Sequence, residues 1–237
     1  VKVEMINQIA VIEGNRLLKN KAFPEALAIF RKTLQNRNYI DSTNIAVIHN
    51  SIGNTLMNMR EFTEASKAFY KAIAFAPDYS HPYENLGELS HKNQEFTKAL
   101  VYYDEAISRS LGRTDTSLEL SSNKYDLLWI LMRKGECLID YYNTSKNKSL
   151  LAQALENYYT ADHIVDLIRF ESYEYQSKLF WREQSAALYT KAVEICSLLD
   201  KPSEAYYFME KNKAILLLED LSNEEAKKNA NLPVELA

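Results

Sequence analysis

Residues 46–79 read AVIHNSIGNTLMNMREFTEASKAFYKAIAFAPDY, and residues 80–113 read SHPYENLGELSHKNQEFTKALVYYDEAISRSLGR. Small and aromatic residues recur after 34 positions: Gly53, Ala65, Phe69 and Ala72 are followed by Gly87, Ala99, Tyr103 and Ala106. A period of this length predicts one helix-turn-helix unit per repeat. We expect the small residues to let the paired helices approach closely and the aromatic residue to fill the seam toward the neighbouring unit.

The end of each second helix has its own signal. Pro77 should end the helix before it, because proline lacks an N–H and clashes with the preceding turn. One period later Leu111 replaces the proline, so we expect the stop at Gly112.

The same template predicts three further units. A unit at about residues 7–40 carries Gly14, Ala26, Phe30 and Thr33. A unit at about 116–170 carries Gly135, Ala154, Tyr158 and Ala161, with seven extra residues that we expect to lengthen the turn around Asn143 to Lys148. A degenerate unit at about 172–225 pairs a long helix from Ser172 to Leu199 with one that starts at Pro202.

This 34-residue pattern resembles the tetratricopeptide repeat family. The resemblance implies an all-α fold: a right-handed superhelical array, or solenoid, of about five helical hairpins that forms one domain over residues 1–237. The composition agrees, because only 5 Gly and 5 Pro occur in 237 residues and both residue types disfavour helix interiors. We also expect a fragment of a longer protein, since the chain begins with Val1 and ends on the non-repeating segment Asn231 to Ala237.

Composition excludes several classes of function. The formal net charge is -4, and the basic residues form no stripe, which argues against nucleic-acid binding. No apolar run reaches the roughly 20 residues that cross a bilayer, so we expect no membrane association and a cytoplasmic location.

No sequence motif indicates catalysis, metal binding or cofactor binding. Cys137 and Cys196 form no CxxC pair and are expected in the core, and the four histidines have no second ligand at helical spacing. No nucleophile motif or phosphate-binding loop is present, so we expect no enzymatic activity, metal or cofactor in this segment.

The first helix of each unit should face the concave side of the array, where such scaffolds hold an extended peptide or a partner helix. On this face we expect a lining of amides and charges with a few apolar contacts. The candidate binding residues are Asn50, Asn54, His81, Asn85, Glu88, Trp129, Met132 and Arg133, with Glu136 beside them.

Part of this set resembles the peptide clamp of tetratricopeptide domains that grip a peptide C-terminus. Asn54, Asn85 and Arg133 match clamp positions, whereas Asn50 and Trp129 stand where the family has two lysines. The resemblance implies that the matching trio could hold an extended segment, because Asn bonds a peptide backbone and Arg chelates a carboxylate. The missing lysines remove most of the positive charge. Solvated polar side chains remain the alternative interpretation of the trio.

Two apolar residues on the same helix are open to two interpretations. Trp129 and Met132 have the residue types that anchor protein interfaces. Aromatic residues at helical spacing are more often part of the core, and we favour that interpretation for Trp129.

The last third of the chain carries a second resemblance. It reads ADHIVDLIR from Ala161, SKLFWRE from Ser177, LYTKAVEIC from Leu188 and EAYYFMEKNKAILLLEDL from Glu204. This is similar to the helical region before the caspase-like domain of bacterial CHAT proteins, whose final helix pattern is matched by Glu210, Lys211, Lys213, Ala214, Leu217 and Leu218. The family's catalytic His and Cys would lie beyond this segment.

The residues also predict an amphipathic helix from Ala205 to Glu225 with Ala214, Leu217, Leu218 and Leu221 on one face, where a downstream domain could pack. We therefore expect a protein- or peptide-binding array that regulates a caspase-like cysteine peptidase. The alternatives are a stand-alone interaction scaffold, or a sensor array attached to a histidine kinase or a transcription factor.

Overall fold

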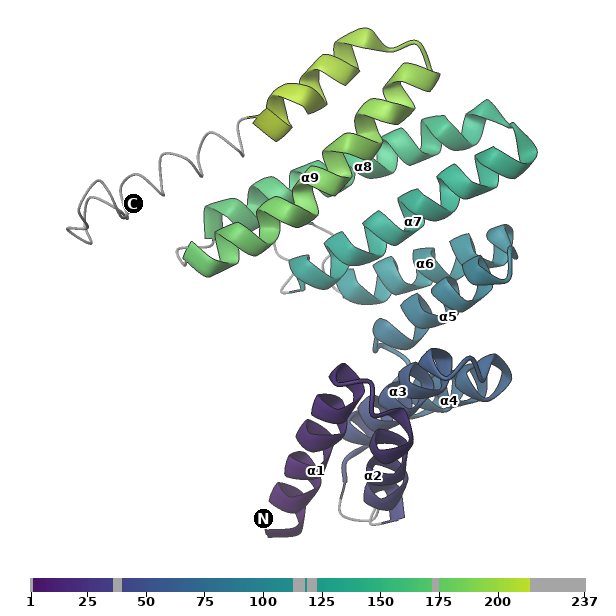
Figure 1. Cartoon of the computed structure of the whole chain (residues 1–237), viewed down its shortest axis with the longest axis vertical. Coiled ribbons are helices and arrows are strands. Elements are labelled where there is room, and N and C mark those ends of the chain that lie inside the picture. Colours follow the sequence, from purple (N-terminus) through teal and green to yellow (C-terminus); the bar gives the residue numbers. More distant parts are fainter. Residues whose placement is uncertain (1, 36–39, 113–117, 119–122, 172–174, 214–237) are drawn as a thin grey trace, which may run out of the picture. The chain divides into compact units, whose positions relative to one another are not determined.

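The computed structural model of the chain describes residues 2–35, 40–112, 118, 123–171 and 175–213, with side chains left out at 2–7, 170–171 and 175–184. Every regular element in these residues is a helix, which confirms the all-α prediction. The helices are α1 Lys2–Lys19, α2 Phe23–Gln35, α3 Ser42–Asn58, α4 Phe62–Phe75, α5 His81–Lys92, α6 Phe96–Leu111, α7 Lys124–Ser145, α8 Lys148–Glu171 and α9 Tyr175–Leu198 (Figure 1). A further helix occupies 202–213.

The helices follow each other as antiparallel hairpins, with α1 packed on α2, α3 on α4 and α5 on α6. The second helix of one hairpin then contacts the first helix of the next, as α2 does with α3 and α4 with α5. The described residues separate into two compact units, residues 1–133 and 134–237, which divide within α7. A single continuous array over the whole chain stays a prediction.

One backbone conformation recurs in the turns inside the hairpins. Lys21, Arg60, Gln94 and Asp200 each adopt a left-handed backbone, with φ between 56° and 64°. The amide that follows each of them donates to the carbonyl five residues earlier at 2.9 Å, which closes the Schellman motif that ends the first helix. None of the four residues is glycine, which is the usual sequence signal for this motif, so the motif could not be predicted from the sequence.

The predicted ends of the second helices are confirmed. The helix α4 ends at Phe75, and the amide of Ala76, directly before Pro77, still donates to the carbonyl of Ala72. The helix α6 ends at Leu111, and Gly112 takes a positive φ of 84° that glycine adopts without strain.

The extra residues of the fourth hairpin do not lengthen its turn, so that expectation was wrong. They extend the helices instead, since α7 has 22 residues and α8 has 24. Lys146 takes the left-handed turn conformation, and its amide donates to the carbonyl of Tyr142 at 2.7 Å, so the helix continues almost to the turn. Helical hydrogen bonds therefore satisfy backbone groups that an extended loop would have left to water.

The repeated glycine and aromatic residues meet within their own hairpin. A Cβ added at Gly14 would lie 2.5 Å from the ring of Phe30, and one at Gly87 would lie 2.8 Å from the ring of Tyr103. Gly53 with Phe69, and Gly135 with Tyr158, repeat the arrangement. The aromatic residue thus covers the glycine of its own unit, a contact that we had placed at the seam to the neighbouring unit.

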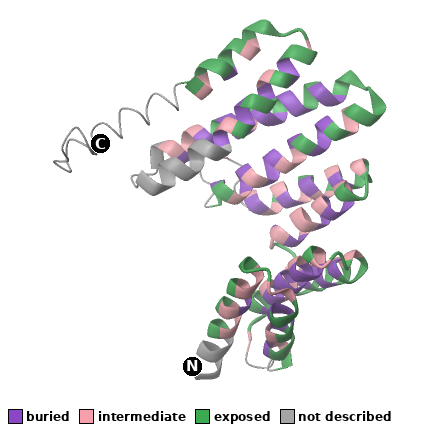
Figure 2. Ribbon diagram, in the orientation of Figure 1, coloured by how far each residue is buried: buried purple, intermediate pink, exposed green. Residues whose placement is uncertain are grey.

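The core follows the repeat. In residues 1–133 it is built from α2, α3 and α4 around Phe30, Phe69, Ile48 and Leu56, with Leu86 from α5 (Figure 2). In the described part of residues 134–237, Tyr158, Tyr189 and Phe208 are buried aromatic residues. Cys137 and Cys196 are buried and are not joined in a disulfide, and burial raises the pKa of Cys137 to about 12.

Candidate functional site

Three first helices of residues 1–133 are joined by polar side chains, which we name the first-helix cluster: Asn50, Asn54, Glu84, Asn85, Glu88 and Arg133. The amide nitrogen of Asn85 on α5 donates to Oδ1 of Asn50 on α3 at 2.9 Å. Asn50 is buried, with 4% of its surface exposed. The structure therefore brings the two predicted asparagines of neighbouring units into direct contact.

Arg133 is held by two carboxylates of α5. Its Nε lies 3.0 Å from Oε1 of Glu84, and its Nη1 donates to Glu88, which also pairs with Lys92 at 2.6 Å. The side chains of Glu84 and Glu88 are 14% and 17% exposed. Because both carboxylates already engage the guanidinium, Arg133 is poorly placed to chelate a third from a peptide C-terminus.

Burial and charge act differently on the two glutamates. Burial raises the pKa of Glu84 above its usual value, and the charge of Arg133 only partly opposes this. At Glu88 burial also acts to raise the pKa, but Arg133 and Lys92 outweigh it and hold the pKa below its usual value. The carboxylates of Glu84 and Glu88 thus place partly desolvated negative charge beside Arg133.

Asn54 lies one turn beyond Asn50 on the same helix. Its Oδ1 is buried and finds no hydrogen-bond partner among the described residues. A buried carbonyl oxygen without a donor carries a desolvation cost.

His81 belongs to the edge of this region. Its ring stacks on Tyr79 at 5.1 Å between centroids, and its Nε2 lies 3.8 Å from Asp126. Burial, with the negative charges of Asp126 and Glu84, raises the pKa of Tyr79 to about 12.

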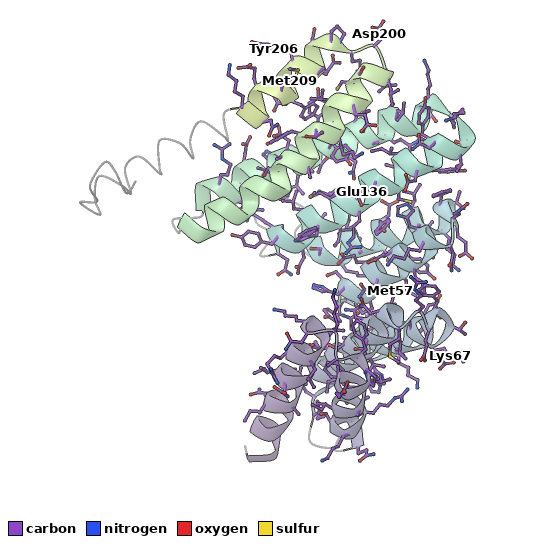
Figure 3. The ribbon with its side chains drawn as sticks, in the orientation of Figure 1. Met57, Lys67, Glu136, Asp200, Tyr206 and Met209 are labelled. Atoms are coloured by element: carbon purple, nitrogen blue, oxygen red, sulfur yellow. The ribbon has the colours of Figure 1, made fainter. Side chains whose placement is uncertain are left out.

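Trp129 and Met132, the two apolar candidates, are less exposed than an anchor residue for a partner protein would be. Met132 is buried, with 8% exposed, and Trp129 is half-buried in α7. A partner cannot use Met132 without opening the core, so we leave it out of the proposed contact set. Glu136, by contrast, is exposed (Figure 3).

Glu84 is not among the residues predicted from the sequence, although the repeat register points to it. The residue two positions before the repeated glycine is Ser51, Asn85 or Arg133, and each contacts the first helix of the preceding unit. Ser51 donates to Oδ1 of Asn15 at 3.3 Å. The partner of Arg133 must therefore be sought on α5, where glutamates lie.

A second polar cluster lies in residues 134–237 and is centred on Asp162 of α8. Asp162 is 3% exposed and accepts hydrogen bonds from the hydroxyls of Tyr189 at 2.7 Å and Tyr207 at 2.6 Å. Lys211 donates to Asp166 at 2.5 Å and lies 3.4 Å from Asp162. These contacts hold the helix 202–213 against α8.

Lys211 is one of the residues that resemble the CHAT pattern, and the structure gives it this structural role. Glu210 and Lys213 lie 3.8 Å apart on the exposed side of the same helix. Ala214, Leu217, Leu218 and Leu221, the predicted apolar face, lie outside the described residues.

In the part of the chain that the structure describes, no group of three or more His, Cys, Asp or Glu side chains is arranged to hold a metal ion. No described helix combines the length and the apolar character needed to cross a membrane.

Known proteins share parts of this sequence and fold. A family model described as "Tetratricopeptide repeat" matches residues 46–79. A curated relative, the uncharacterized protein ycf37 of Cyanophora paradoxa, is 28% identical over 90 residues, which are 38% of this chain and 52% of that protein. The chain thus spans about half the length of this relative.

Solved structures share the fold across most of the chain. BtubC from P. vanneervenii has a TM-score of 0.69 at 13% identity, over 92% of this chain and 82% of that one. YrrB, described as a tetratricopeptide protein with an unusual peptide-binding site, has a TM-score of 0.51 at 17% identity, over 92% and 90%. The chain therefore has the fold of tetratricopeptide repeat proteins and carries one such repeat at residues 46–79.

Proposed function

We propose that this chain is a protein-binding scaffold that holds an extended peptide segment on the first-helix cluster. The observation that carries the proposal is the row of polar side chains that links α3, α5 and α7. The peptide-binding site named for YrrB, which has a similar fold, supports the same class of function.

The chemistry favours an internal peptide segment over a free C-terminus. Asparagine side chains can donate to and accept from a peptide backbone, so Asn54 and Asn85 suit an extended chain. Arg133 is already paired with Glu84 and Glu88, which removes the cation that a terminal carboxylate would need. Trp129, which is half-buried and lies one turn before Arg133 on α7, would add apolar contact.

A random peptide library displayed on phage tests this directly. Peptides selected on the wild-type chain should lose at least tenfold in affinity for the variant N54A/N85A/R133A. The double variant E64A/K67A, which changes an exposed ion pair on α4, should bind as tightly as wild type. Amidation of the peptide C-terminus should leave the affinity unchanged.

Both variants must first show the far-ultraviolet circular dichroism of the wild type. Unchanged peptide affinity in a correctly folded N54A/N85A/R133A variant would exclude the first-helix cluster as the binding surface. A strong loss on amidation would instead restore the carboxylate-clamp hypothesis.

We further propose that the array regulates a caspase-like peptidase domain that follows it in the natural protein. The CHAT-like pattern at Glu210, Lys211 and Lys213 supports this, and a downstream domain would pack on the apolar face predicted at Ala214, Leu217, Leu218 and Leu221. Binding would have to favour one state of the array or of its junction, because a ligand with equal affinity for both states switches nothing. The proposed location is the cytoplasm.

The reading frame beyond residue 237 decides between this proposal and its alternatives. An α/β domain with a His and a Cys in caspase-like context would lead to an assay of partner-triggered proteolysis. A histidine kinase or DNA-binding domain would select the sensor alternative, and a stop codon would leave an interaction scaffold.

A further inference from the structure

The outward face of α1 carries two isoleucines in an unusual setting. Ile9 is 60% exposed and Ile12 is 69% exposed. They lie three residues apart on one side of the helix, together with the exposed Arg16 and Lys19. Two adjacent, strongly exposed isoleucines are a costly surface for a helix that remains in water.

The repeat register shows what normally covers these positions. Ile9 stands five residues before Gly14, and the equivalent residues of the later units are Ile48, Pro82 and Ile130, all buried. These positions lie on first helices, and in the hairpins of residues 1–133 each later first helix contacts the hairpin before it. Ile9 is therefore exposed at a seam position that is buried in the later units.

The position of Ile12 gives the same result independently. It stands two residues before Gly14, and its equivalents Ser51, Asn85 and Arg133 each contact the preceding first helix. These later contacts are polar, whereas Ile12 offers an apolar side chain. A neighbour that covers Ile12 should therefore present an apolar surface.

The last described hairpin, formed by α9 and the helix 202–213, presents such a surface. Directly before the buried aromatic of each second helix stand Ile29, Ala68, Tyr102 and Asn157, which are buried or half-buried. In the helix 202–213 the equivalent residue is Tyr207, before Phe208, and it is 40% exposed. Leu198, at the end of α9, is 43% exposed. The last described hairpin thus exposes the surface that, in the earlier units, contacts the first helix of the next hairpin.

We propose that these faces meet between two copies of the chain, so that α1 of one copy packs head-to-tail on the terminal hairpin of another, formed by α9 and the helix 202–213. The contact would repeat the seam that already joins consecutive hairpins within residues 1–133. Because it joins two different faces, each copy keeps one face open, and further copies can add until a ring closes or a filament grows.

Sedimentation velocity over a wide concentration range tests the association. The weight-average mass of the wild-type chain should rise with concentration, whereas that of I9E/I12E should stay at the monomer value. A matched control is Val101→Glu, because Val101 is an exposed apolar residue, 61% exposed, that lies away from the seam register. This variant should associate like wild type.

Cross-linking of the unmodified chain tests the orientation and does not depend on the folding of a variant. In a mixture of ¹⁴N- and ¹⁵N-labelled protein, an amine-reactive linker should join Lys19 of one copy to Lys201 or Lys213 of another. A wild-type chain that stays monomeric at every concentration overturns the proposal and leaves the α1 face to a different protein. Association that survives I9E/I12E, or mixed-isotope links that join α1 to α1, also overturns it.

Discussion

Tyr103 of α6 lies against Gly87 of α5, so that a Cβ on Gly87 would be 2.8 Å from the ring carbon Cε1. The same contact occurs in four hairpins, which explains why the sequence repeats a glycine and an aromatic at fixed positions. The ring requires a partner without a side chain, since a normal carbon contact needs about 3.5–4.0 Å.

We expect Gly87→Ala to destabilise the protein although alanine is the better helix former. The gain in helix propensity is about 1 kcal/mol, whereas overpacking of a core costs about 1–3 kcal/mol. Urea unfolding should therefore give a lower free energy of unfolding for Gly87→Ala than for the wild type. In the background Tyr103→Leu the same substitution should cost less, and an equal cost in both backgrounds would show that the ring is not the cause.

The left-handed turn at Arg60 offers a stabilising substitution. An L residue pays about 1–2 kcal/mol for this conformation, and glycine does not. Arg60→Gly should therefore raise the free energy of unfolding by up to about 1 kcal/mol. Lys67→Gly, in the interior of α4, should lower it by about 1 kcal/mol. A lower melting temperature for Arg60→Gly would contradict the assignment of the turn.

The buried Asp162 should make Tyr189 important for stability. Removal of the Tyr189 hydroxyl takes away a 2.7 Å hydrogen bond to a buried carboxylate. Hydrogen bonds to charged groups contribute about 1.5–3 kcal/mol, so Tyr189→Phe should lower the free energy of unfolding by about that amount. Tyr206→Phe, at a residue 65% exposed, is the control and should be close to neutral. Equal effects of the two substitutions would argue against the Asp162 cluster.

His49 should make stability depend on pH. Its ring stacks on Phe75, and burial, together with the charge of Lys71, lowers its pKa below 6.5. The unfolded chain then binds the proton more readily than the folded one, so the contribution of His49 is complete above the unfolded pKa and is lost as pH falls below it.

Urea midpoints measured at about pH 7.5 and about pH 5.5 should therefore be further apart for wild type than for His49→Phe, which keeps an aromatic ring against Phe75. Lys71→Met should reduce the wild-type difference by removing the neighbouring charge. An identical difference in wild type and His49→Phe would show that other groups set the pH dependence.

Much of the fold could be predicted from signals that act over short segments of the chain. The 34-residue period located the hairpins, Pro77 and Gly112 marked helix ends, and Pro202 marked a helix start, because these signals act within a few residues of the chain. The period also located Asn50 and Asn85, the polar residues that meet on neighbouring first helices.

The helical hairpins and their register follow from the sequence, because hydrophobic spacing, helix stops and small residues are properties of short segments. Three outcomes could not be predicted in this way: Arg133 pairs with Glu88, 45 residues away, Met132 is buried, and the extra residues near Asn143 continue a helix. Such outcomes depend on which side chains neighbouring hairpins bring together and on how much space their packing leaves, and no repeat period encodes either.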